Sequence, residues 1–197
     1  MNENAKNSRS TDRRVKMTCQ LLKNSLIELM KTKSLHEISI KKICENADVN
    51  RSTFYRYYNT QYDLYNEILS EISRDIKDII AAYKDEENPV LSSLTDILTY
   101  TEEHRELILV ILSSNGSLVI GEMFSRNVNS YIDTDNTSEL AMYCTQFVSA
   151  GLANILWSWL SKEERRSAKE VAMVINSLLL HGVKRAIIYS DKGEKKS

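Results

Sequence analysis

The sequence predicts an all-α protein. Proline occurs once and glycine five times in 197 residues, so few residues interrupt helices. Apolar residues recur every three or four positions along much of the chain, which is the period of a helix with one buried face, and strand signals are essentially absent. We therefore expect an N-terminal domain of three helices, followed by a larger helical domain.

The first helix is expected to follow a polar N-terminus. Residues 1–10 contain Lys6 and Arg9 and are predicted to form a flexible basic arm, either idle in solution or inserted into a minor groove. Apolar residues then recur at helical spacing and predict an amphipathic helix that ends near Lys33. These residues are Val15, Cys19, Leu22, Leu26 and Leu29.

Two short helices are expected next, joined by a tight turn. Ser39 is a suitable N-cap for the second helix, whose buried side contains Ile40, Ile43, Cys44 and Ala47. Asp48 and Val49 form the turn, and Asn50 is a suitable N-cap for a third helix that ends near Tyr58. We place the first domain at residues 11–60.

The second domain is expected to cover residues 61–190. Thr60 and Asp63 have the spacing of a capping box and begin a long fourth helix, whose apolar stripe runs from Leu64 to Tyr83. The only proline, Pro89, follows the end of this helix. Further helices are predicted over 90–102, 105–114, 117–132, 137–160 and 163–189. Ser161–Glu164 is read as another capping box before the last helix, and residues 191–197 as a disordered tail.

Charge is distributed unevenly along the chain. Residues 1–60 carry 12 Lys and Arg against 6 Asp and Glu, a net charge of +6, whereas residues 61–197 carry 14 against 21, a net charge of −7. This gradient predicts that only the N-terminal domain meets a polyanion, although a chance gradient of solvated charges would look the same.

Several classes of protein are excluded. Three widely spaced cysteines predict reduced thiols rather than a disulfide framework or a zinc site, and the three histidines lack metal-ligand spacing. No secretory signal, membrane span, phosphate-binding loop or catalytic motif is present. We therefore expect a soluble cytoplasmic protein that is not an enzyme and that needs no metal or cofactor.

The two short helices form a candidate helix-turn-helix. In such a motif the second helix packs on the first through one face and offers hydrogen-bonding groups on the other, which lies in the major groove of DNA. Val49 and Phe54 suit the packing face. The polar and aromatic face consists of Arg51, Ser52, Thr53, Tyr55, Arg56 and Tyr57. Tyr58 and Tyr65 are instead expected in the core.

The stretch from Ser39 to Leu64 resembles the DNA-binding signature of the TetR/AcrR family. The matching positions are Ile43, Ala47, Val49, Thr53, Tyr55, Tyr58 and Leu64. Residues 147–160 resemble, less closely, a C-terminal domain found among Firmicutes members. The resemblance implies a bacterial, nucleoid-associated regulator. Such a protein would be a homodimer that binds a palindromic DNA operator as a repressor and is released by a small-molecule effector.

The resemblance also implies roles for single residues. Ser39 matches a hydroxyl that contacts a phosphate, Arg51 and Ser52 match positions that reach bases, and Thr53, Tyr55 and Tyr57 match positions that contact phosphates or base edges. Three departures matter. Tyr57 stands where histidine is common in the family, and it keeps a hydrogen-bonding group. Asp48 replaces the usual glycine, but aspartate tolerates a left-handed conformation, so the turn is expected to survive. Gln61 replaces a phosphate-binding lysine, although the helix N-terminus there could still attract an anion.

The C-terminal domain is expected to bind the effector and to dimerise. Residues that could line an effector pocket are Tyr100, His104, Phe124, Tyr143, Phe147 and Trp157. A stripe on the last helix could pack in a two-fold four-helix interface, or could be wholly internal to a monomer; it consists of Ala168, Ala172, Ile175, Leu179, Gly182 and Ala186. Two rival functions are a protein-binding transcriptional adaptor or coactivator with the same fold, and a helical enzyme or ligand carrier.

Overall fold

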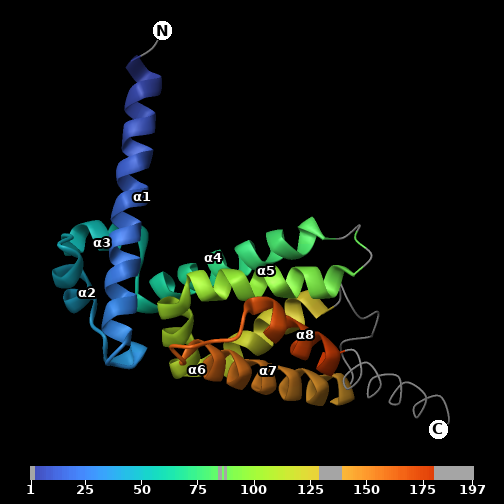
Figure 1. Cartoon of the computed structure of the whole chain (residues 1–197). Coiled ribbons are helices and arrows are strands. Elements are labelled where there is room, and N and C mark those ends of the chain that lie inside the picture. The colour runs from blue at the N-terminus through green and yellow to red at the C-terminus, as the bar shows by residue number, and fades with distance from the viewer. Residues whose placement is uncertain (1–2, 84–85, 87, 129–138, 180–197) are drawn as a thin grey trace. The chain divides into compact units, whose positions relative to one another are not determined.

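The computed structural model describes residues 3–83, 86, 88–128 and 139–179, and the regular structure within these ranges is entirely helical (Figure 1). The predicted all-α class is therefore confirmed. The chain divides into two compact units, residues 1–72 (unit 1) and 73–197 (unit 2). The division falls inside the long helix α4, Gln61–Ala82, rather than at residue 60 where the sequence placed the domain boundary.

Unit 1 contains three helices, a 3-10 turn and the first half of α4. The helices are α1, Glu3–Met30; η1, Leu35–Glu37; α2, Ile40–Ala47; and α3, Arg51–Tyr57. Residues 3–10, expected to be a flexible arm, form the first turns of α1. The core is formed by apolar side chains of every element except η1: Leu22, Leu26, Met30, Ile43, Phe54, Leu64 and Ile68. The predicted buried faces of the first four helices are thus largely confirmed.

Unit 2 contains the rest of α4 and four further helices. These are α5, Pro89–Glu103; α6, Arg105–Val128; α7, Glu139–Leu160; and α8, Ala168–Leu178. Helix α6 packs along α7, and α5 packs along α8. Buried residues from these four helices form the core: Leu98, Ile108, Ile111, Val148, Leu160, Ala172 and Ile175. Pro89 occupies the start of α5, as a residue without an N–H donor should.

The predicted break between helices 105–114 and 117–132 is wrong. Helix α6 continues through Asn115, Gly116 and Ser117, and Gly116 is buried. A β-carbon at position 116 would lie 2.8 Å from Cδ2 of Leu112. This glycine therefore serves close packing along the helix and does not mark a turn.

The start of the last helix was also predicted wrongly. Residues 163–167 are not helical, and α8 begins at Ala168 behind a capping box of Ser167 and Glu170. The Ser167 hydroxyl accepts from the Glu170 N–H at 3.3 Å, and the Glu170 carboxylate accepts from the Ser167 N–H at 3.0 Å. The predicted segments 180–189 and 191–197 lie outside the described residues.

Candidate nucleic-acid interface

The turn between α2 and α3 has the geometry that a helix-turn-helix requires. Asp48 ends α2 in a left-handed conformation, with φ 52° and ψ 44°, and its N–H donates to the carbonyls of Cys44 and Glu45. The expectation that aspartate preserves this turn in place of glycine is confirmed. The Val49 N–H then donates to the Cys44 carbonyl at 3.0 Å, which holds the residue before the N-cap of α3 against the end of α2.

Side-chain caps define where both short helices begin. Ser39 caps α2 by accepting from the Lys42 N–H at 3.3 Å. Asn50 caps α3, since its side-chain oxygen accepts from the Ser52 N–H and from the Ser52 hydroxyl, both at 2.9 Å. Both predicted N-caps are confirmed. They satisfy backbone donors that would otherwise lack partners at the helix starts.

Phe54 anchors α3 to the body of unit 1. Its side chain is fully buried, and its ring meets Tyr55 edge-on at 5.8 Å between centroids and Tyr58 at 5.5 Å. Tyr58 is buried as expected, whereas Tyr65 is only half-buried. Burial raises the pKa of Tyr58, and the nearby Cys19 and Glu67 raise it further. The aromatic cluster fixes the rotation of α3, and therefore decides which face of the helix points outward.

The outward face of α3 carries four of the residues predicted to contact DNA. Arg51, Ser52, Tyr55 and Arg56 are exposed and, at 100° per residue, lie on one side of the helix opposite Phe54. Thr53 and Tyr57, on the flank of this face, are half-buried. The arrangement offers two guanidinium groups, a hydroxyl and a phenol to one partner, which suits the edges of bases and the phosphates of a duplex. Contact with DNA stays a prediction.

Ser39 and Gln61 lie at the starts of α2 and α4. Ser39 is exposed and Gln61 is half-buried. The Thr60 and Asp63 capping box is confirmed, because the Asp63 carboxylate accepts from the Thr60 and Asn59 N–H groups at 2.9 Å. The Asp63 carboxylate thus binds the last two backbone N–H groups before α4. Whether this helix end attracts an anion stays a prediction.

A buried ion cluster, which the sequence did not reveal, joins α1 to α4 inside unit 1. The Lys23 ammonium lies 2.7 Å from Glu67 and 2.6 Å from Glu71, and the Lys23 side chain is only 9% exposed. Burial by itself would lower the pKa of Lys23, but the hydrogen bonds and charges of the two glutamates outweigh it and raise the pKa. The available signal was a lysine between Leu22 and Leu26, on the buried side of α1.

Two family models match the chain. Residues 25–68 match the model of bacterial regulatory proteins of the tetR family, and residues 88–181 match that of a transcriptional regulator C-terminal region. The matches fall in both units and together take in more than half of the chain. The chain belongs to the TetR family of transcriptional regulators.

Solved structures agree with this fold. A TetR transcriptional regulator from Streptococcus agalactiae 2603V is 19% identical, with a TM-score of 0.61 over 87% of this chain and 98% of that chain. The dihydroxyacetone kinase operon activator DhaS is 20% identical, with a TM-score of 0.53 over 85% and 96%. The fatty acid degradation regulator FadR from Bacillus halodurans is 15% identical, with a TM-score of 0.55 over 84% and 95%.

One curated relative also matches. The HTH-type transcriptional regulator YxbF of Bacillus subtilis (strain 168) is 23% identical over 97 residues. The match spans 47% of this chain and 26% of YxbF. A TetR-family assignment makes the chain a regulator and not an enzyme.

The regulatory half of this TetR-family chain does not gather the six residues predicted to line an effector pocket. Tyr100 and His104 stack with ring centroids 4.3 Å apart, and the Tyr100 hydroxyl donates to Asp75 at 2.8 Å. Tyr143 and Phe147 are exposed on α7. The side chain of Phe124 lies outside the described residues. Trp157 lines a groove in the described part of unit 2.

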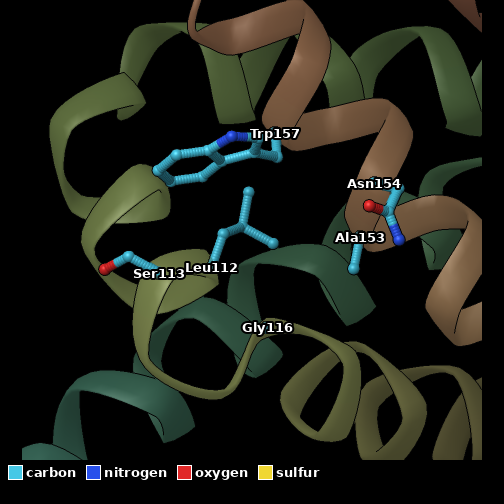
Figure 2. A pocket seen from close by; sticks show the side chains of 6 residues that line it. All are labelled: Leu112, Ser113, Gly116, Ala153, Asn154 and Trp157. Atoms are coloured by element: carbon cyan, nitrogen blue, oxygen red, sulfur yellow. The ribbon is translucent and has the colours of Figure 1, made fainter.

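That groove lies between α6 and α7 and has a volume of 370 Å³ (Figure 2). It is lined by Leu112, Ser113 and Gly116 from α6 and by Ala153, Asn154 and Trp157 from α7. The Trp157 ring lies over Leu112, and the Asn154 amide lies at the other end of the α7 side. Its lining is mixed, because Leu112, Ala153 and the Trp157 ring are apolar, whereas Ser113 and Asn154 carry hydrogen-bonding groups.

The predicted dimerisation stripe is largely internal. Ala168, Ala172 and Ile175 are buried within the protomer, on the side of α8 that packs along α5, so they are unavailable to a partner. Leu179 is half-buried, and Gly182 and Ala186 lie outside the described residues. The exposed apolar residues of α8 are instead Met173, Val174 and Leu178.

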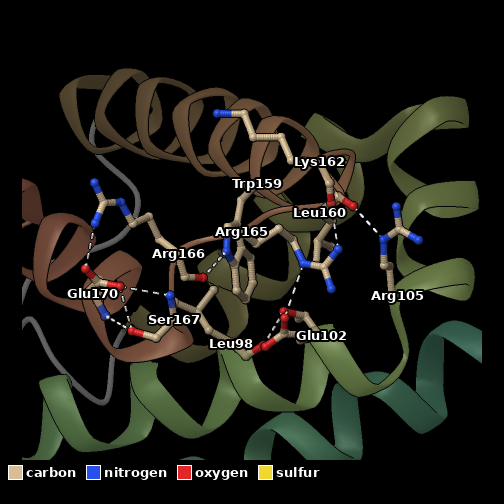
Figure 3. Close-up of polar contacts among 11 residues, drawn as sticks. Leu98, Glu102, Arg105, Trp159, Leu160, Lys162, Arg165, Arg166, Ser167 and Glu170 are labelled. Carbon is tan, nitrogen blue, oxygen red and sulfur yellow. Dashed lines mark hydrogen bonds and ion pairs between the residues drawn. The ribbon is translucent and has the colours of Figure 1, made fainter.

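Polar contacts hold the connection between α7 and α8 (Figure 3). The Arg105 guanidinium donates to the Leu160 carbonyl at 2.6 Å, and Arg165 pairs with Glu102 at 3.2 Å. The Trp159 indole N–H donates to the Arg166 carbonyl at 2.8 Å. These contacts hold residues 160–166 in a loop, and α8 therefore cannot begin at residue 163.

Within the described residues, no group of three or more His, Cys, Asp or Glu side chains is placed to hold a metal ion. Across the same ranges, no helix is both long and apolar enough to span a bilayer.

Proposed function

We propose that the protein is a dimeric transcriptional repressor that reads a palindromic operator with α3 and is released by a small-molecule effector. The proposal rests on the outward face of α3, where Arg51, Ser52, Tyr55 and Arg56 stand on a helix anchored by Phe54. Such a helix fits the major groove, and two copies about 34 Å apart would read two half-sites of one duplex. We place this activity in the bacterial cytoplasm, where the DNA lies.

The direct test is operator selection from a random duplex library, followed by binding measurements on single-base variants. Arg51→Ala should cost about 1–3 kcal/mol at one base pair and relax discrimination there. Lys169→Ala, which removes an exposed cation from α8 in unit 2, is the control and should leave discrimination unchanged. Equal weakening of Arg51→Ala on all duplexes would rule out base reading by Arg51.

A second copy of the chain is the best occupant of the outward apolar face of α7 and α8. On α7, Tyr143, Phe147, Gly151 and Asn154 recur every three or four residues and are exposed, Phe147 to 78%. A β-carbon at position 151 would meet no atom within 4 Å, so a partner helix could approach closely there. Exposed apolar area of this kind is usual where proteins associate.

Gly151→Arg tests the dimer. The protomer has open space at this position, so the variant should keep its helical circular dichroism while sedimenting as a monomer. Ala81→Arg, at an exposed site on α4, is the matched control and should remain dimeric. If Gly151→Arg sediments as the wild type does, another surface forms the dimer.

The groove at Trp157 is the proposed effector site. Its volume of 370 Å³ lies within the range of small-molecule sites, and the indole and Leu112 offer an apolar surface for an effector. A compound that lowers operator affinity should quench Trp157 fluorescence and should lose its effect in Ser113→Trp, which fills the groove. An effector that still acts on Ser113→Trp binds elsewhere.

An activator or adaptor is the second candidate. The observation that favours it is the fold similarity to DhaS, which is described as an operon activator. A reporter gene behind the selected operator separates the two, because deletion of a repressor raises expression and deletion of an activator lowers it. In a pull-down experiment, an adaptor would also co-purify with a stoichiometric protein partner, and it would bind its operator weakly.

A further inference from the structure

The N-terminal half of α1 extends beyond the core of unit 1. The first fully buried side chain of α1 is Leu22, and none of the residues from Arg13 to Leu21 is buried. Figure 1 shows this part of α1 running past α2 and α3 of the same unit. Hydrophobic packing therefore does not account for the extension, and its surface chemistry must indicate what it contacts.

That surface carries a polar row with two cations. Arg13, Lys16, Gln20 and Asn24 are exposed, and their spacing of three or four residues places them on one side of the helix. At the C-terminal end of the row, the Gln20 side-chain amide donates to the Asn24 side-chain oxygen at 2.9 Å. Leu22 and Leu26 lie on the opposite side. Positions 6 and 9, which are Lys and Arg, continue the same register toward the N-terminus.

Cations outnumber acids along the row, since residues 6–16 hold five cations and one acid, Asp12. Arg13 and Lys16 form no ion pair with the side chains that the structure describes, whereas Lys23, one turn inside the core, is paired with Glu67 and Glu71. Like charges three and four residues apart destabilise a solvated helix. An anionic surface alongside the row would relieve this repulsion, which makes a polyanion the partner that fits.

We propose that this row contacts the phosphates of the operator duplex beside the bases read by α3. The inference rests on the proposed function, because DNA is the polyanion already expected at unit 1. Helix rise is about 1.5 Å per residue, so residues 6–16 span about 15 Å, the length of about four phosphates along one strand. The row adds affinity and salt dependence but carries no sequence information.

The test compares two double variants of the full chain on a duplex selected by the wild type. Arg13→Gln with Lys16→Gln removes two cations of the row, and glutamine keeps helix propensity. Lys162→Gln with Lys169→Gln removes two exposed cations from unit 2 and is the control. Affinity is measured by fluorescence anisotropy from 50 to 200 mM salt.

Each phosphate contact contributes about 0.9 to the slope of log affinity against log salt. With two copies of the chain on one duplex, the row variant lacks four such contacts. Its slope should therefore be shallower by about 3.6, and its affinity should fall about a hundredfold less than that of the wild type between 50 and 200 mM salt. The control should keep the wild-type slope. The ratio of affinities for correct and mutated operators should be the same in the row variant as in the wild type.

Three results would overturn the inference. If the row variant keeps the wild-type slope while Arg51→Ala still relaxes discrimination, the row does not contact DNA and the proposed function stands. If the row variant loses discrimination, it reads bases and does not hold phosphates. If the wild type neither selects a duplex nor responds to salt, both the inference and the proposed function fail together.

Discussion

The two units differ in how they treat charged and apolar side chains. In unit 1, Lys23 is buried and paired with two glutamates, and the exposed face of α3 carries cations and hydroxyls. Unit 2 leaves large apolar side chains outside, among them Phe147, Trp157 and Met173. Each surface fits a different partner, since exposed cations suit the phosphates of DNA and exposed apolar rows suit another protein surface.

This difference also predicts that the two units can be damaged separately. In the proposed dimer, a change inside unit 1 should weaken DNA binding while the two copies stay associated, and a change on the exposed face of α8 should act on the association first. The first variant below tests that separation, and the later ones test local contacts in each unit, in order of decreasing expected effect on stability.

Lys23→Met should destabilise unit 1 by about 2 kcal/mol. Removing one partner of a buried ion pair costs about 3–5 kcal/mol, and we discount this because Glu67 and Glu71 remain 41% exposed. Urea unfolding followed by circular dichroism measures the loss. Sedimentation should still show a dimer, while operator binding at 37 °C falls. Loss of the dimer together with operator binding would contradict independent units.

Lys41→Met is the matched control for this variant. Lys41 pairs with Glu45 at 3.8 Å on the surface of α2, and an exposed pair contributes about 0.5 kcal/mol or less.

The two lysines should also differ in pH dependence. Because the pKa of Lys23 is raised in the folded state, its contribution is present below about pH 10.4 and is lost as the pH rises through the folded value.

Ser167→Ala should cost about 1 kcal/mol in unit 2, because it removes the hydroxyl that caps α8. Hydrogen bonds from Ser167 lower the pKa of Glu170, so the capping box stabilises α8 at neutral pH and weakens as the pH falls below about 4.3. Thermal unfolding at pH 7 and pH 3.5 measures both effects. The difference between variant and wild type should be smaller at pH 3.5.

Ser161→Ala is the control, since Ser161 has the same spacing to an acidic residue but lies in the loop. It should change the unfolding free energy by less than about 0.5 kcal/mol. An equal loss in both serine variants would mean that the hydroxyl cap does not stabilise α8.

The two serines also illustrate what a sequence can predict. Ser161 and Ser167 are both followed three residues later by glutamate, and the local pattern alone does not choose between them. The choice is made by contacts distant in sequence, in which Arg105 holds the Leu160 carbonyl and Glu102 holds Arg165. The position of α8, and hence which of its faces is buried, could not be predicted from local spacing.

Unit 1 was predicted better because its signals are local. The caps Ser39, Asn50 and Thr60 each act within three residues of themselves, and the apolar period of α2 and α4 specifies their buried sides. The Lys23 cluster escaped prediction because its partners lie more than 40 residues away. Trp157 was among the residues predicted to line a pocket, but its neighbours in the groove were not, since the groove needs α6 beside α7.

The smallest expected effect is at the turn of the helix-turn-helix. Asp48 holds a left-handed conformation that costs most L-residues about 1–2 kcal/mol and that glycine adopts freely. Aspartate tolerates this region better than most residues, and glycine loses more entropy on folding, so Asp48→Gly should change the unfolding free energy by less than about 1 kcal/mol.

Asp48→Val should cost more, because branching at Cβ crowds the left-handed backbone. Urea unfolding of the three proteins gives the order, and operator binding should follow it. If valine were tolerated as well as glycine, the backbone at position 48 would have to leave the left-handed region, and α3 would no longer be held by the turn seen in the structure.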